Sequence, residues 1–335
     1  MKNLIYTIIV SIFLFSCEKD KQISDPDPAN QTILDSICVK TIVFDSEGTA
    51  WIGTLNQGLV KYSVTETEIF NSSNSPLTNN PIWDIAVDSK DNIWIGTNGL
   101  VKYDGVGFTT YNTSNSDIPE DVVMSLEVDS SDDIWMASSR FKLGGIAKFD
   151  GEIFTVFTPE NSALPVNLTT AIAIDNDDNV WVAATESVYN TYLIKISGES
   201  WIVYDSVDFK QKIGWISDIE INSKNQVCGV IDKTTISING SNPKVFCFDG
   251  SNMESYTVEG SRWEGYKSIM VDNNDNYWCT FGQGYAYSKG TMWTRIESEV
   301  VDGYYTNAYF TIEQAPDGNI WIGKDSGIEI IEQNK

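Results

Sequence analysis

The stretch from Ile85 to Thr97 reads Ile-Ala-Val-Asp-Ser-Lys-Asp-Asn-Ile-Trp-Ile-Gly-Thr, and it decides the fold. Alternating apolar residues lead into Asp88, a polar turn follows, and Trp94 stands six residues after the acid. The same register returns, with spacings between successive acid positions of 43, 41, 46, 47, 50 and 43 residues. The other copies are Asp45/Trp51, Asp129/Trp135, Asp175/Trp181 and Asp272/Trp278, with degraded copies at Asn222/Cys228 and Ala315/Trp321. A period near 45 residues indicates a ring of similar units.

Each repeat resolves into four short strands, which we name a to d from the first apolar run onward. In the clearest copy, strand c is expected at 99–103 and strand d at 108–111, after the strands that contain Ile85 and Trp94. Period-two alternation and β-branched or aromatic residues are typical of strands, and Asp-Gly pairs such as Asp104-Gly105 are hairpin turns. The sequence therefore predicts an all-β protein, a seven-bladed β-propeller of four-stranded antiparallel blades.

The last repeat ends soon after Ile331 and leaves no room for its own strand d. The segment Thr32-Ile33-Leu34 precedes the first strand a and has strand character. We therefore predict that the N-terminal segment completes blade seven and closes the ring, so that a single propeller domain covers residues 31–335. The recurring tryptophans are expected to pack between adjacent blades.

The segment Ile93-Trp94-Ile95-Gly96-Thr97, followed by Gly99-Leu100-Val101-Lys102-Tyr103-Asp104, resembles the repeat of the two-component regulator propeller family. The resemblance extends from Val39 to the C-terminus. It implies a place among the periplasmic sensor propellers of Bacteroidetes, which respond to polysaccharide fragments. Members of that family carry two rings, a membrane helix and a kinase. With one ring, this chain is expected not to signal by phosphotransfer itself.

The N-terminal segment has the features of a targeting signal. The apolar run from Leu4 to Phe15 is shorter than the roughly 20 residues that span a bilayer, and it suits a signal peptide. It ends at Ser16-Cys17, which resembles a bacterial lipoprotein signal. The resemblance implies a signal peptide at 1–16, a lipidated Cys17 and an acidic tether at 17–30. The expected location is the outer membrane, on its periplasmic or cell-surface side, with membrane contact only through the lipid anchor.

The formal charge of −25, from 22 basic and 47 acidic residues, repels phosphate backbones and argues against nucleic-acid binding. The chain also has no histidine, which removes the commonest general base and zinc ligand. An enzyme would have to be a hydrolase or lyase that works with Asp, Glu, Tyr, Lys or Cys. Enzymatic activity is left open, and a binding function is preferred.

The acidic a–b turns offer two interpretations. Asp175, Asp177 and Asn179 have the alternate spacing of calcium ligands, but these turns lack the bidentate Glu of an EF-hand loop. Asx side chains also cap tight turns. We therefore expect turn chemistry and no cofactor, with calcium as the alternative. Cys228 and Cys247 fall on neighbouring strands of blade five, where either a disulfide or two free thiols would fit.

Irregular insertions mark the candidate binding face. In an up-and-down blade the b–c and d–a connections emerge on one face, and the insertions fall there, on blades three to six. Loops on a rigid scaffold often carry binding, and Tyr, Trp and Arg are frequent anchors. The candidate ligand-binding residues are Arg140, Phe141, Lys142, Tyr189, Tyr192, Lys210, Trp215, Arg262, Trp263, Tyr266, Tyr304 and Tyr305.

These features together predict a lipid-anchored envelope protein, a monomeric ring that binds a glycan or an envelope protein. The alternative is a structural adaptor in an envelope complex.

Overall fold

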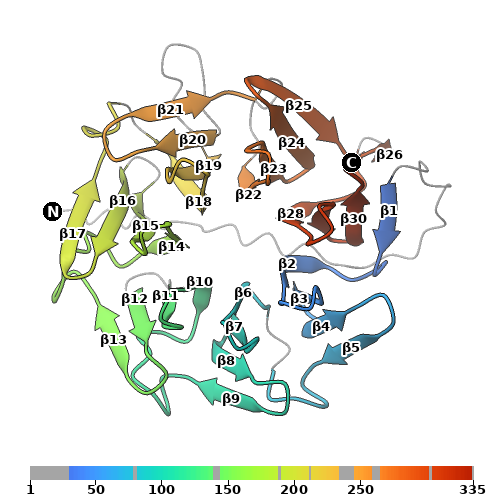
Figure 1. Ribbon diagram of the computed structural model, residues 1–335, viewed down its shortest axis with the longest axis horizontal. Coiled ribbons are helices and arrows are strands. Elements are labelled where there is room, and N and C mark those ends of the chain that lie inside the picture. The colour runs from blue at the N-terminus through green and yellow to red at the C-terminus, as the bar shows by residue number, and fades with distance from the viewer. Residues whose placement is uncertain are drawn as a thin grey trace, which may run out of the picture.

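The computed structural model describes residues 30–77, 81–138, 144–187, 190–210, 213–233, 245–258, 265–301 and 304–333. Within these ranges the regular elements are all β-strands, and they form seven four-stranded antiparallel sheets and one two-stranded hairpin. The seven sheets stand around a central axis, with one strand of each sheet facing the centre (Figure 1). The predicted seven-bladed propeller is confirmed.

The strands of the first four blades follow one another along the chain. Blade one holds β2 (Val39–Phe44), β3 (Ala50–Thr54), β4 (Leu59–Tyr62) and β5 (Thr67–Phe70). Blade two holds β6 (Asp84–Val87), β7 (Ile93–Thr97), β8 (Gly99–Tyr103) and β9 (Phe108–Tyr111). Blade three holds β10 (Val123–Val128), β11 (Ile134–Ser138), β12 (Gly145–Phe149) and β13 (Phe154–Phe157). Blade four holds β14 (Thr169–Ile174), β15 (Val180–Ser187), β16 (Asn190–Ser197) and β17 (Ser200–Tyr204).

The remaining blades complete the circle. Blade five holds β18 (Trp215–Ile221), β19 (Val227–Lys233), β20 (Val245–Phe248) and β21 (Met253–Tyr256). Blade six holds β22 (Tyr266–Val271), β23 (Tyr277–Phe281), β24 (Gly284–Lys289) and β25 (Met292–Glu297). The hairpin of β26 (Val300–Val301) and β27 (Tyr304–Tyr305) follows blade six. Blade seven takes β28 (Tyr309–Gln314), β29 (Ile320–Lys324) and β30 (Gly327–Ile331) from the C-terminal end.

The fourth strand of blade seven comes from the N-terminal side of the chain. β1 (Asn30–Ile33) pairs antiparallel with β30, and Ile33 lies opposite Ile328. The strand begins one residue before the predicted domain start, and Leu34 lies just beyond its end. Figure 1 shows β1 beside β30 at the point where the first and last blades meet. The strand predicted to close the ring is therefore present.

The conserved register of acid and tryptophan has one physical cause, which repeats in five blades. The acid accepts a hydrogen bond from the indole Nε1 of the tryptophan six residues later, at 2.9–3.0 Å. Its other oxygen accepts backbone N–H groups of the a–b turn, as Asp88 does from Asn92 at 3.0 Å. The five tryptophans are at most 6% exposed. Each acid thus caps its turn, and the tryptophan lies in the core, as predicted; the hydrogen bond between acid and indole was not predicted.

A second set of hydrogen bonds joins each a–b turn to the turn of the next blade. The backbone N–H and Oγ of Ser89 donate to the carboxylate of Asp132 at 3.0 and 2.8 Å, and Ser46 bonds in the same way to Asp91. Asp91 and Asp132 both have positive φ, which Asp tolerates in a tight turn. We call this set the turn girdle; its other links are Ser130–Asp178, Asn176–Asn225, Ser223–Asp275 and Asn273–Gln314. Between blades seven and one the girdle position is taken by Pro316, which lies next to Gly48 and has no N–H to donate.

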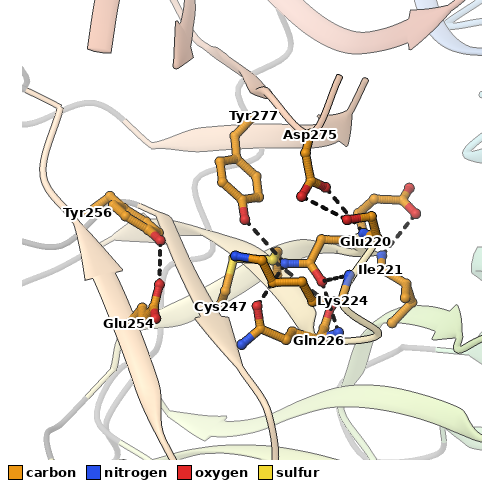
Figure 2. The surroundings of a disulfide bond; sticks show 12 residues. Glu220, Ile221, Lys224, Gln226, Cys247, Glu254, Tyr256, Asp275 and Tyr277 are labelled. Carbon is orange, nitrogen blue, oxygen red and sulfur yellow. Dashed lines mark hydrogen bonds between the residues drawn. A yellow bond between two sulfur atoms is a disulfide. The ribbon is translucent and has the colours of Figure 1, made fainter. Parts of the chain in front are cut away.

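The two degraded repeats, in blades five and seven, differ in what replaces the contact between acid and tryptophan. In blade five Cys228 replaces the tryptophan and forms a disulfide with Cys247, its cross-strand partner. The equivalent positions in blades one to four hold a tryptophan and a lysine, whose ammonium lies 5.0–5.4 Å from the ring centroid. Figure 2 shows Tyr277 and Asp275 of blade six reaching the turn of blade five. In blade seven Ala315 replaces the acid, and the buried Nε1 of Trp321 has no hydrogen-bond partner among the described residues.

Candidate functional site

The propeller has two unlike faces. The a–b and c–d turns lie on one, the turn face, and the longer b–c and d–a connections lie on the other, which we call the loop face. The sequence predicts a ligand-binding set on the loop face. Six of its residues lie outside the described residues, as does Cys17 at the predicted lipidation site. These six are Arg140, Phe141, Lys142, Tyr189, Arg262 and Trp263.

The described candidates are distributed over four strands and one connection between blades. Tyr192 is partly buried in β16, and Lys210 is exposed in the connection between blades four and five. Trp215 begins β18 and is partly buried. Tyr266 is fully buried, and its ring packs against Phe281 at 5.4 Å between centroids, so it belongs to the blade interior. Tyr304 and Tyr305 form β27, and Tyr305 is 38% exposed.

A different set of side chains gathers at the loop-face end of the inner strands. Lys40, the second residue of β2, places its Nζ 5.6 Å from the ring centroid of Trp83 and 5.3 Å from that of Phe310. These residues come from blades one, two and seven, which are neighbours in the ring. Each is partly buried. The three side chains form an aromatic and basic cluster, which we call the channel mouth.

Electrostatics at the channel mouth are set by burial and by nearby charges. Burial lowers the pKa of Lys40, and the charge of Lys267, in the equivalent position of blade six, lowers it further. Asp84 and Asp218 oppose this shift from the next level of the channel. A lysine held between two aromatic rings, with carboxylates below it, presents both hydrogen-bond donors and acceptors to a polar ligand.

Asp84 and Asp218 also tie adjacent blades together. Asp84 accepts the backbone N–H of Ile85 at 2.9 Å and that of Leu126 in blade three at 2.8 Å. Asp218 repeats this arrangement with the N–H groups of Ile219 and Ile269. Burial raises the pKa of Asp84 to about 6 and that of Asp218 to about 7, although these hydrogen bonds pull in the opposite direction. These groups therefore titrate within the physiological range.

The inner strands of all seven blades, with Asp84 and Asp218 among their residues, line a cavity of about 350 Å³. Its walls carry five partly buried acids of the inner strands, whereas the neighbouring Lys40 and Lys267 do not line it. Three of the acids stand at one repeat position, two residues before the turn acid, in alternate blades: Glu127, Glu220 and Glu313. Burial raises the pKa of all three, and Glu313 reaches about 8. We call these three residues the glutamate ring.

A second cavity, of about 340 Å³, lies between blades three and four on the turn-face side. Its polar lining is already paired, because Lys148 contacts Asp133 at 2.6 Å and lies 5.4 Å from the centroid of Trp135. We therefore place the candidate site at the channel and its mouth.

The carboxylates that were weighed as calcium ligands are engaged in the turn. Asp175 accepts hydrogen bonds from Trp181 and Asn179, and it pairs with Lys195 at 3.1 Å. Asp177 accepts from the side chain of Asn225 at 2.9 Å. Across the described residues, no group of three or more His, Cys, Asp or Glu side chains is arranged to hold a metal ion.

Sequence reasoning missed the channel and its mouth. The signal that finds them is the inner strand aligned from repeat to repeat: the position five before the turn acid holds Lys40, Trp83, Met124, Thr170, Ser217, Lys267 and Phe310. This position has no residue in common between the repeats, so the pattern of acid and tryptophan does not reveal it.

One repeat matches a known family on sequence. Residues 76–99 match the model described as Two component regulator propeller. This match lies in blade two, on the segment from which the resemblance was inferred, and it confirms that resemblance. No curated protein sequence matches the chain significantly. The described part of the chain contains no helix with the length and hydropathy needed to cross a bilayer.

Solved structures extend the likeness to the whole ring. The extracellular domain of BT4673 from B. thetaiotaomicron, described as a hybrid two component system, is 19% identical with a TM-score of 0.72 and covers 92% of this chain. This chain spans 40% of that one. Streptogramin B lyase is 15% identical with a TM-score of 0.69, covering 91% of this chain and 96% of its own. PorZ, a surface component of the type-IX secretion system of Porphyromonas gingivalis, is 13% identical with a TM-score of 0.57, covering 84% and 45%. At these identities the likeness shows the fold alone.

Proposed function

We propose that this protein is a binding protein of the bacterial cell envelope that holds a glycan at the channel mouth on the loop face. The observation that carries the proposal is the placement of Lys40 between the rings of Trp83 and Phe310, above the carboxylate of Asp84. Sugar rings stack on aromatic faces, and their hydroxyls both accept from ammonium groups and donate to carboxylates. A few converging polar groups beside apolar rings are typical of small-ligand sites.

The cell-envelope location rests on the N-terminal signal and on the kinds of protein with this fold. Propellers of similar structure are an extracellular sensor domain and a surface component of a secretion system. We propose that the chain is anchored by lipid on Cys17. Cys17→Ala is expected to move the protein from the membrane fraction to the soluble fraction, and mass spectrometry of the wild-type N-terminal peptide should show the added acyl mass. An unmodified Cys17 in membrane-associated protein would contradict the anchor.

A protein partner is the second candidate, and a separate observation favours it. The hairpin of β26 and β27 exposes apolar side chains on its way from blade six to blade seven, with Val300 52%, Val301 41% and Tyr305 38% exposed. Exposed apolar residues gathered in one place often mark protein interfaces. In this case Val300→Ser would weaken partner capture, whereas changes at the channel mouth would not.

The test is a glycan panel read by calorimetry and thermal shift with the full chain. Lys40→Ala and Trp83→Ala should each lower the affinity of a bound glycan by about fivefold, because one aromatic or cation contact contributes about 1 kcal/mol. The matched controls are Lys61→Ala, which removes a lysine 5.4 Å from Trp51, and Trp201→Ala on outer strand β17. Both controls should bind as wild type. Loss of binding in the controls alone, or no loss in any variant, would exclude the channel mouth.

A further inference from the structure

The glutamate ring inside the channel is unlike the other acids of the protein. The carboxylate oxygens of Asp84 and Asp218 each accept hydrogen bonds from backbone N–H groups of two blades. Glu127 accepts no hydrogen bond from any described residue, although it is partly buried and lines the cavity. The charged groups that act on it from the neighbouring strands are all acids: Glu220, Asp84, Asp218 and Glu313. A buried carboxylate without a partner is costly, so a ligand that supplies the missing donor would be stabilised there.

The arrangement of the acids limits the kind of cation. No three acids among the described residues converge as a metal site requires. Instead they stand at two levels, Asp84 and Asp218 at one, and Glu127, Glu220 and Glu313 two residues farther along the strands. Two residues of extended strand separate the levels by roughly 6.8 Å. The cavity of about 350 Å³ is large enough for a small organic molecule.

We propose that the channel binds a linear aliphatic diamine or polyamine, with one ammonium group at Glu127 and a second toward Asp84 and Asp218. A four- or five-carbon chain between two amines spans about the distance between the levels. The ammonium groups donate up to three hydrogen bonds each, which suits a ring of carboxylates. Ile85, Leu126 and Ile312 are buried between the blades, so the methylenes between the two amines would face the backbone and polar side chains of the cavity wall.

Because the pKa values of these acids are raised, binding of a cation is expected to release protons and to depend on pH. Glu313 with a pKa of about 8 and Asp218 with a pKa of about 7 are largely protonated in the empty channel at pH 6. A bound dication favours their charged forms, so binding releases protons and strengthens as the pH rises from 6 to 8. Lys40 and Lys267, near the other end of the acidic levels, oppose the cation and limit how far it enters.

The experiment is calorimetry of the full chain with 1,4-diaminobutane and spermidine in 150 mM salt, in buffers of different ionisation enthalpy. We expect binding at least tenfold tighter than that of 1-butylamine, with proton release. Glu127→Gln should weaken it at least tenfold, and Glu313→Gln serves as the second variant if the first does not fold. Glu66→Gln, which removes an exposed acid of a c–d turn, is the charge-matched control and should bind as wild type.

Three outcomes would overturn the proposal: no diamine binding in the millimolar range, equal binding by Glu127→Gln and Glu66→Gln, or binding of calcium without binding of diamine. The glycan site at the channel mouth is tested separately, since Lys40→Ala should weaken glycan binding about fivefold and leave diamine binding intact or stronger. Failure of either proposal is therefore distinguishable from failure of the other.

Discussion

Two opposite substitutions, Asp88→Ala in blade two and Ala315→Asp in blade seven, are expected to change the stability of the protein in opposite directions. Asp88 accepts hydrogen bonds from Trp94, from the side chain of Asn92 and from two backbone N–H groups of its turn. Asp88→Ala leaves the buried indole N–H without a partner, as Trp321 already is in blade seven. Loss of a charged acceptor costs about 1.5–3 kcal/mol, and the uncapped turn adds more, so we expect a loss of about 3 kcal/mol.

Ala315→Asp is the reverse change. It supplies Trp321 with the acceptor that the other tryptophans have, but it also buries a carboxylate at a position that is 5% exposed. The expected net gain is about 1 kcal/mol. For a chain of this size, about 2 °C of melting temperature corresponds to 1 kcal/mol, so the shifts are about −6 °C for Asp88→Ala and about +2 °C for Ala315→Asp.

Differential scanning calorimetry of both variants at pH 7 measures these shifts. Asp88→Asn is the control for size, because it keeps one turn acceptor and removes the charge. If Asp88→Ala melts with the wild type, the acid is not the turn cap that the hydrogen bonds indicate. If Ala315→Asp destabilises the ring by several degrees, the unpartnered indole of Trp321 is not a defect that an acid can correct.

Three further predictions concern the channel, the girdle and the closing strand. Burial raises the pKa of Glu313 to about 8, above its unfolded value, so the folded state binds more protons and stability falls as the pH rises from about 4.5 to 8. Glu313→Gln should stabilise the protein by up to about 4 kcal/mol at pH 8.5 and not at pH 5, which melting at both pH values measures. Gly48→Asp together with Pro316→Ser should complete the turn girdle between blades one and seven and raise the melting temperature more than the two single changes sum to, which a double-mutant cycle measures. Deletion of residues 31–37 removes the pairing of β1 with β30 and should lower the melting temperature by more than 10 °C in thermal denaturation; unchanged melting would contradict ring closure by this strand.

The repeat predicts the fold because every blade needs the same two interactions, a cap for its a–b turn and a hydrogen-bond acceptor for its indole. Every a–b turn must be capped and every indole must be satisfied, so acid and tryptophan return at a fixed distance wherever a blade is built. The N-terminal closing strand follows from the same reasoning, because the last repeat lacks a strand that the ring requires. Blade five shows the limit of the pattern: the register places Cys228 opposite Cys247, but only the paired strands establish the disulfide.

The candidate site could not be predicted in the same way. Lys40, Trp83 and Phe310 come from the first, second and last repeats, and ring closure alone brings them together. Their repeat position differs in every blade, so periodicity hides it. Glu127 likewise gains meaning only when Glu220 and Glu313 face the same cavity. The proposed function depends on residues that vary at repeated positions, whereas the acid and tryptophan that cap the turns and fill the core recur.

The measurement that tests the central claim most directly is the calorimetric affinity of the strongest panel glycan for the wild type and for the Lys40→Ala/Trp83→Ala double variant. With folding confirmed by an unchanged melting profile, we predict that the double variant loses at least tenfold in affinity, and less than the sum of the two single losses because both side chains contact one ligand. Equal affinity for the wild type and the double variant would contradict the account and place the ligand elsewhere on the propeller.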